Sequence, residues 1–179
     1  MATCAYRDGF ALPPARFAGT DWKTHCHSNL RSGSGASDKS EFPNSRREAV
    51  FIIARWLASR EFPDRLMPQG GDRAFVQDLV YTTIRRFRSL HEVLSKLVER
   101  MPKGEGEALL LVGAAQILFM PDVPDFAAVN ETVDAAKLTN KRAAGLVNAV
   151  LRNLIRRRDE MKAFLAAAPL ATRESYPTD

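Results

Sequence analysis

The stretch Glu107-Ala-Leu-Leu-Leu-Val-Gly-Ala-Ala-Gln-Ile-Leu-Phe-Met120 is the most hydrophobic helical segment of the sequence. Apolar residues occupy every side of such a helix, which is typical of an element enclosed by others. We therefore expect it at the centre of the fold, where Gly113 would let a neighbouring helix approach closely. The residues expected to face the core are Leu110, Ala114, Ile117 and Leu118. The apolar run has thirteen residues, whereas a bilayer-spanning helix needs about 20, so we expect no membrane span.

Amphipathic patterns flank this segment on both sides. They predict helices over 45–61, from 72 to 88, over 89–101, through Val129 to 139, from 142 to 158 and over 159–168. We find no stretch with the period-two alternation of a strand. Short loops between the patterns are typical of a helical bundle, so the sequence predicts an all-α fold of six to seven helices.

Polar residues at three places have predicted local roles. Ser45 with Glu48, and Ser89 with Glu92, have the spacing of capping boxes, which satisfy free N–H groups where helices begin. Asn148 lies within an otherwise apolar helix face. Because a buried amide needs hydrogen-bond partners, we expect Asn148 to tie two helices together.

The chain divides into three parts by composition. Residues 1–44 hold short apolar pieces without a period, and a Ser/Gly-rich stretch at 28–37, so we expect a flexible, disordered tail. Residues 45–168 form the predicted helical domain, and residues 169–179 a C-terminal linker. The tail contains His25-Cys26-His27. Consecutive side chains rarely converge on one ion, so we predict no metal site.

Positive charge is concentrated in the middle of the chain. The 179 residues carry 26 basic and 21 acidic side chains, a net charge of +5. Residues 46–158 hold nineteen of the basic and thirteen of the acidic groups, with arginine clusters at 46–47, 85–88 and 152–158. Such clusters form either solvated helix faces or a surface for a polyanion, and the planar guanidinium suits phosphate. Composition leaves nucleic acid and an acidic protein open as partners.

We find no constellation of catalytic residues in the sequence. A glycine-rich nucleotide loop following a strand is lacking, and both cysteines, Cys4 and Cys26, lie in the predicted tail. His91 has no Cys or Ser motif attached, and we expect it on a helix surface. We therefore predict a protein that is not an enzyme and has no cofactor. So few cysteines, without a secretory signal, favour a cytoplasmic location.

Several motifs resemble the NusB-like RNA-binding fold. They are Asp72-Arg-Ala-Phe-Val-Gln-Asp-Leu-Val-Tyr81, Gly113-Ala-Ala-Gln-Ile-Leu-Phe119, Asp122-Val-Pro-Asp-Phe-Ala-Ala-Val-Asn-Glu-Thr-Val-Asp-Ala-Ala-Lys137 and Ala144-Gly-Leu-Val-Asn-Ala-Val-Leu-Arg-Asn153. The resemblance spans residues 45–165. Two branches share this fold. One is the free-standing transcription antitermination factor NusB, which binds boxA RNA with a ribosomal protein, and the other is the N-terminal domain of small-subunit rRNA cytosine-5 methyltransferases (RsmB, also called Fmu or Sun).

The last motif resembles the methyltransferase branch more closely. Antitermination factors have Phe-Val-Asn-Gly-Val-Leu-Asp there. This chain has Leu146 in place of the aromatic residue expected to stack on RNA, and Arg152 in place of the acid. The catalytic half of those methyltransferases, with its S-adenosylmethionine site, would begin just after Tyr176-Pro177, where this sequence ends. The resemblance therefore implies an RNA-binding module that does not itself methylate.

The resemblance also implies which residues contact RNA. The arginine-rich start of the first helix corresponds to Arg46 and Arg47. Charge clustering adds Arg152, Arg156, Arg157 and Arg158. Few exposed aromatic residues are evident, so we expect modest sequence specificity. The main interpretation is docking on structured rRNA. The alternatives are a NusB-type antitermination factor that depends on a ribosomal protein, and a helical protein-interaction or homodimerisation module.

Overall fold

The computed structural model describes residues 44–70 and 72–169. The elements follow in the order α1 (Ser45–Ser59), η2 (Pro63–Leu66), α2 (Arg73–Arg85), α3 (Phe87–Ser95), α4 (Glu105–Phe119), α5 (Asp125–Thr139), η3 (Lys141–Ala143), α6 (Ala144–Arg156) and α7 (Arg158–Ala167). These described ranges contain α-helices and short 3-10 helices and no strand, which confirms the predicted all-α class. Of the predicted tail over residues 1–44, residues 1–43, with His25-Cys26-His27, lie outside them, whereas Asn44 is described at the start of α1. Of the predicted linker over residues 169–179, residues 170–179 lie outside them.

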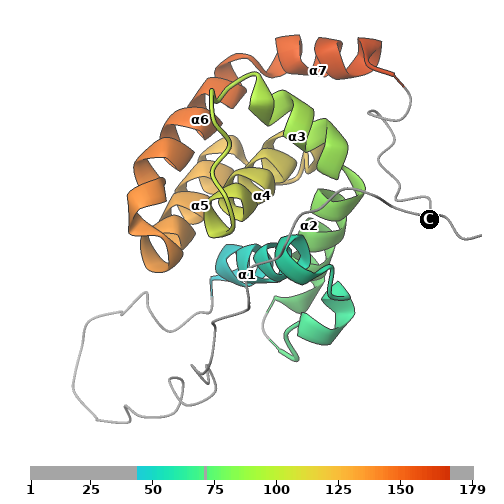
Figure 1. The fold of residues 1–179 in the computed structure, drawn as a ribbon, viewed down its shortest axis with the longest axis vertical. Coiled ribbons are helices and arrows are strands. Elements are labelled where there is room, and N and C mark those ends of the chain that lie inside the picture. Colours follow the sequence, from blue (N-terminus) through green and yellow to red (C-terminus); the bar gives the residue numbers. More distant parts are fainter. Residues whose placement is uncertain (1–43, 71, 170–179) are drawn as a thin grey trace, which may run out of the picture. The chain divides into compact units, whose positions relative to one another are not determined.

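Helix α4 lies at the centre of the bundle, as its composition predicted. It contacts α1, α2, α3, α5 and α6 (Figure 1). Every residue from Ala108 to Leu118 is buried. A Cβ atom on Gly113 would lie 2.6 Å from Cδ1 of Leu151 in α6, so the predicted close approach of a neighbouring helix at Gly113 is confirmed.

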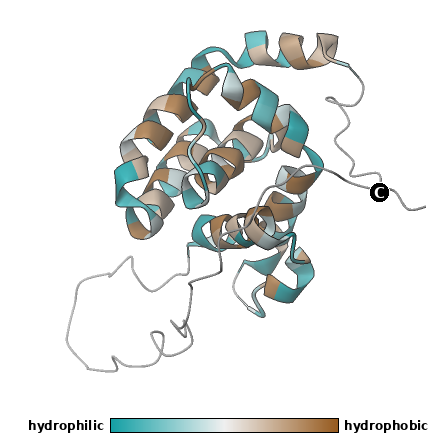
Figure 2. Cartoon of the chain, viewed as in Figure 1, coloured by the Kyte–Doolittle hydropathy of each residue, from teal (hydrophilic) through white to brown (hydrophobic). Residues whose placement is uncertain are grey.

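The surrounding helices pack apolar residues against α4 and against one another, and hydrophobic and hydrophilic residues alternate along most of them (Figure 2). Helix α1 buries Val50 and Ile53, which lie one turn apart on its inner face. Helix α7 packs on α3 and α6 and buries Met161 and Leu165. No helix of the described part is long and apolar enough to cross a membrane.

Helix α3 begins earlier than its predicted cap. Only Arg86 separates α2 from α3, and its backbone N–H donates to the carbonyl of Thr82 at 3.0 Å while its own carbonyl accepts from the N–H of Leu90 at 2.8 Å. Ser89 consequently lies inside the first turn of α3, where it is only 1% exposed. The predicted capping box of Ser89 and Glu92 is therefore wrong.

Candidate nucleic-acid interface

Helix α1 is capped by Asn44 and not by Ser45. Oδ1 of Asn44 accepts hydrogen bonds from the backbone N–H groups of Arg46, at 3.0 Å, and Arg47, at 3.3 Å. Ser45 is the first helical residue, so the capping box predicted for it is wrong. Asparagine is as good a cap as serine, and Nδ2 of Asn44 also donates to the carbonyl of Glu131 in α5 at 3.4 Å. This second bond anchors the start of α1 on α5.

The side chain of Arg46 takes part in a hydrogen-bond network inside the bundle. Its Nε donates to Oε1 of Gln116 at 3.1 Å. Gln116 is fully buried in α4 and donates from Nε2 to the carbonyl of Val112, at 3.1 Å, and to Oγ1 of Thr132, at 3.2 Å. The network joins α1, α4 and α5. Buried polar networks whose members are all bonded specify one arrangement of the elements they join.

An aromatic ring also contacts this guanidinium. Cζ of Arg46 lies 4.3 Å from the centre of the Phe75 ring in α2, which is a favourable cation–π distance. Burial lowers the pKa of Arg46 from its ordinary value, although the carboxylates of Glu131 and Asp72 act in the opposite direction. Arginine nevertheless stays charged at physiological pH. Arg46 therefore contributes to the packing of the bundle, whatever it contributes to a ligand.

Arg47 is exposed at the same helix start. Adjacent helical residues point about 100° apart, so the helix that turns Arg46 inward leaves Arg47 in solvent. None of the ion pairs found in the described residues involves Arg47. The neighbouring Glu48 is partly buried, and this burial raises the pKa of its carboxyl above the ordinary value. The positive charge of Arg47 acts in the opposite direction but is the smaller effect. At a helix start, where the dipole is positive, Arg47 presents a cation to an incoming anion.

Two of the predicted arginines near the end of α6 are paired with carboxylates. Arg157 binds Glu160 at two points, Nε to Oε2 at 2.8 Å and Nη2 to Oε1 at 2.7 Å. This bond lowers the pKa of Glu160. Arg158 is partly buried and forms an ion pair with Asp125, the first residue of α5. An incoming phosphate would have to compete with both carboxylates.

Arg152 and Arg156 are exposed, one turn apart on α6. Nε of Arg152 donates to Oδ1 of Asn148 at 2.9 Å, within the same helix. The predicted interhelical tie through Asn148 is therefore wrong. The buried side of α6 is centred on Leu151, which leaves position 148 at the edge of the core. Neither arginine enters an ion pair with another described residue.

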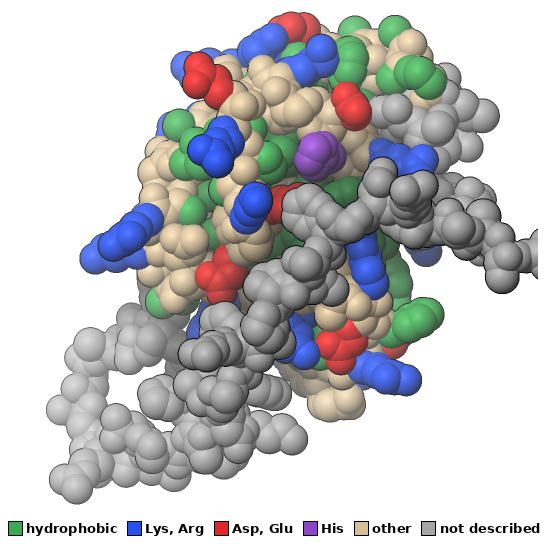
Figure 3. Space-filling view, in the orientation of Figure 1, with side chains coloured by type: hydrophobic (Ala, Val, Ile, Leu, Met, Phe, Trp, Pro, Cys, Tyr) green, Lys and Arg blue, Asp and Glu red, His purple; other side chains and the backbone are tan. Residues whose placement is uncertain are grey.

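The two groups of predicted arginines are connected to α5 at different points along that helix. Asn44, at the start of α1, is bonded to Glu131 in the middle of α5, whereas Arg158 is paired with Asp125 at the beginning of α5. Six residues of helix correspond to about 9 Å along its axis. Over the face in Figure 3, lysine and arginine side chains are scattered with acidic ones between them. On this face of the described part, the basic side chains therefore form no single continuous area.

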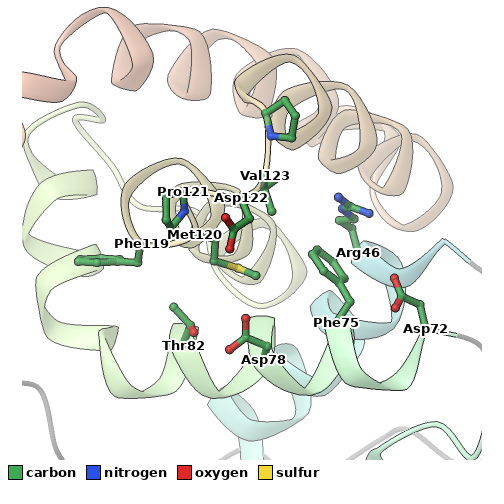
Figure 4. A pocket seen from close by; sticks show the side chains of 11 residues that line it. Arg46, Asp72, Phe75, Asp78, Thr82, Phe119, Met120, Pro121, Asp122 and Val123 are labelled. Atoms are coloured by element: carbon green, nitrogen blue, oxygen red, sulfur yellow. The ribbon is translucent and has the colours of Figure 1, made fainter.

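A groove of about 530 Å³ lies beside Arg46, between α2 and the connection from α4 to α5 (Figure 4). Its acidic lining residues are Asp72, Asp78 and Asp122. Like charges repel, so a phosphate backbone is disfavoured inside the groove. The described residues also hold no group of three or more His, Cys, Asp or Glu side chains suited to a metal ion.

Sequence reasoning missed the partners of Arg46. Gln116 carries a usable signal, because it is a polar side chain within the otherwise apolar run of α4. A buried glutamine needs hydrogen-bond partners, and Arg46 is one of them. Phe75 gave no such signal, because an aromatic residue on a helix is expected in a core. Its stacking on Arg46 depends on how α1 and α2 pack together.

Comparison with solved structures identifies the architecture. The complex of the antitermination factors NusB and NusE with double-stranded RNA contains a chain with a TM-score of 0.57 and 21% identity, covering 63% of this chain and 94% of that one. A chain in the structure of a plectonemic RNA supercoil has the same TM-score, 20% identity, and coverage of 70% and 96%. At these identities the likeness shows a shared fold.

Curated relatives with higher identity are ribosomal RNA small subunit methyltransferase B proteins. That of Pseudomonas putida is 38% identical over 144 residues, which is 75% of this chain and 33% of the relative. That of Pseudomonas syringae pv. tomato is 40% identical over 120 residues, 62% of this chain and 27% of the relative. The chain thus spans a third or less of the length of these relatives. The NusB family matches residues 43–156, well over half of the sequence, and the chain belongs to this family.

Proposed function

We propose that this chain binds RNA and docks on structured small-subunit rRNA as the N-terminal module of an rRNA cytosine-5 methyltransferase. The observation that carries the proposal is the 38–40% identity to small-subunit rRNA methyltransferases over the NusB-like region. Leu146 and Arg152, which depart from the antitermination pattern, support the same branch. In this role the chain acts in the cytoplasm and supplies a docking surface, with no catalytic group or cofactor of its own.

The proposed contacts are not equivalent. Arg47, Arg152 and Arg156 are exposed and without a carboxylate partner among the described residues, so they are the primary phosphate contacts. Arg46 is partly buried and bonded to Gln116, so it contributes positive charge near the RNA rather than a free phosphate contact. Arg157 and Arg158 contribute only where RNA displaces their carboxylates. Phosphate contacts of this kind release counterions, so affinity falls as salt rises.

The test is a titration of the full chain with a labelled small-subunit rRNA hairpin at about 50 mM and about 200 mM salt. Arg47→Ala should weaken binding and lower the salt slope by about one. Arg100→Ala is the matched control, because Arg100 is also exposed and lies in the connection from α3 to α4. Equal affinity of the Arg47 variant and the unmodified chain would refute this site. Binding that ignores salt would refute the phosphate-contact mechanism.

A NusB-type antitermination role is the second candidate. It is favoured by the fold likeness to NusB, which covers 94% of that chain. The same titration distinguishes the two with a boxA-like single strand, with and without the ribosomal protein. Preference for the single strand that appears only with the ribosomal protein present would replace the rRNA-docking proposal.

A further inference from the structure

An exposed phenylalanine lies on the solvent side of α1, between two arginines. Arg47, Phe51 and Arg55 are spaced four residues apart, so they follow one another along one side of the helix. All three are exposed, and Phe51 is 50% exposed. The opposite side of α1 carries its buried residues. The sequence alone indicated few exposed aromatic residues. The exposure of Phe51 becomes evident only in the structure.

The surroundings of Phe51 differ from those of the other exposed phenylalanines. Phe62 and Phe126 are more exposed than Phe51, at 72% and 71%. Phe62 lies between Glu61 and Asp64, and Phe126 follows Asp125 in the chain. Acidic neighbours repel a phosphate backbone. Phe51 also has an acidic neighbour, Glu48, one turn before it, but Glu48 is partly buried beside Arg47. Among the exposed phenylalanines of the described residues, Phe51 is the one with an arginine a turn before it and a turn after it.

The ion pair of Arg55 does not prevent it from contacting an anion. Nη2 of Arg55 lies 3.1 Å from Oε2 of Glu61, and the two side chains are 54% and 30% exposed. Ion pairs this exposed contribute little to stability and are screened by salt. A phosphate can therefore take over the guanidinium of Arg55 while Glu61 returns to solvent. Arg47 needs no such exchange, because none of the ion pairs among the described residues includes it.

We propose that Phe51 is a stacking platform for an unpaired base, with Arg47 and Arg55 holding the neighbouring phosphates. Aromatic side chains stack on the faces of unpaired bases, which are accessible in loops and single strands but not within a duplex. The ligand of this surface is then an RNA loop or other unpaired segment. This inference rests on the proposed RNA-binding function and adds which part of the RNA is recognised.

The test uses the full chain and two forms of one labelled rRNA hairpin, one with normal loop nucleotides and one with abasic loop nucleotides. Both forms carry the same phosphates. Phe51→Ala should lower affinity for the normal loop by at least about fivefold, without changing the salt slope. For the abasic loop this variant and the unmodified chain should bind alike. Phe51→Trp should retain binding, and Phe62→Ala, the matched control, should behave as the unmodified chain.

The outcomes separate this inference from the function on which it rests. If Arg47→Ala weakens binding and Phe51→Ala does not, the stacking platform is refuted while RNA binding stands. An equal loss on normal and abasic loops would also refute stacking. If Phe51→Ala instead turns a dimer into a monomer in sedimentation, with RNA affinity intact, Phe51 belongs to a protein interface. If the unmodified chain binds neither hairpin, the proposed function and the stacking platform fall together.

Discussion

Replacement of Arg46 by alanine should destabilise the bundle, in contrast to replacement of its neighbour. The variant leaves Oε1 of the fully buried Gln116 without its donor. An unsatisfied buried acceptor costs about 1–3 kcal/mol. The lost contact with the Phe75 ring, at 4.3 Å, adds about 0.5–2 kcal/mol. Because Arg46 is only half-buried, water can reach part of this site, so we expect a net loss of about 2 kcal/mol in the free energy of unfolding.

Urea unfolding followed by far-ultraviolet circular dichroism measures this loss directly. Arg47→Ala is the control and should stay within about 0.5 kcal/mol of the unmodified chain, because Arg47 is exposed. A double-mutant cycle with Arg46→Met and Gln116→Leu isolates the hydrogen bond. Methionine keeps an unbranched stem of similar length, so the cycle should report a coupling of about 1 kcal/mol.

Equal unfolding midpoints for Arg46→Ala and the unmodified chain would refute this reasoning, as would a coupling of zero. The expected result also bears on the RNA experiments. A weakened affinity of an Arg46 variant mixes lost contact with lost folding, and a double variant of Arg46 and Arg47 has the same defect. Arg47→Ala alone therefore gives the interpretable test of the helix start.

Two further replacements test the packing of the bundle. Gly113→Val should lower the free energy of unfolding by at least about 2 kcal/mol, because even a Cβ atom at this position would lie 2.6 Å from Cδ1 of Leu151. Urea unfolding measures this loss, and the loss should be much smaller when Gly113→Val is introduced into a Leu151→Ala variant, which lacks the clashing side chain. The hydroxyl of Tyr81 donates to Oδ1 of Asp64 at 2.5 Å, and this bond, followed by burial, raises the pKa of Tyr81. The bond therefore stabilises the fold fully below the unfolded pKa of about 10 and is lost as pH rises through the higher folded value. The Tyr81→Phe variant should thus be less stable than the unmodified chain at neutral pH but not at strongly alkaline pH. In an absorbance titration of the folded chain, the variant should lack the tyrosine ionisation that occurs at the highest pH. A titration curve identical to that of the unmodified chain would contradict this assignment.

The helices were predictable because burial imposes a period on the sequence. In α1, Val50 and Ile53 lie one turn apart and are both buried, and the uniformly apolar α4 lies at the centre, as predicted. The helix starts were less predictable. A serine followed three residues later by glutamate occurs both at caps and inside helices. Ser89 fits the pattern but is internal, because α2 and α3 are separated by one residue, and that junction depends on tertiary packing.

The same helical period also indicated that Arg46 faces inward. The prediction that Arg46 and Arg47 are equivalent RNA contacts did not use this information. Arg46 precedes Val50 by four residues and Ile53 by seven, which is the spacing of one helix face. A residue in step with the core at a helix start is expected to be partly buried. The resemblance to the NusB-like fold treated the two arginines alike, whereas helix phase alone separates an inward from an outward one. The contact of Arg46 with Phe75 on α2 could not be predicted from helix phase, because it depends on how α1 and α2 pack together.

The run of arginines at 152–158 shows why a charge cluster in a sequence overstates the field at a surface. Four arginines occur there in seven residues, and the sequence places two acids directly after them, at 159 and 160. Glu160 neutralises Arg157 one turn away, which helical spacing could have indicated. Arg158 is neutralised by Asp125, thirty-three residues earlier in the chain, and only the tertiary packing of the helices makes that pair. Two of the four, Arg152 and Arg156, have no carboxylate partner among the described residues, and the exposed Asp159 follows the cluster directly. The net attraction for a phosphate backbone at this end of the bundle is therefore well below what the four arginines suggest.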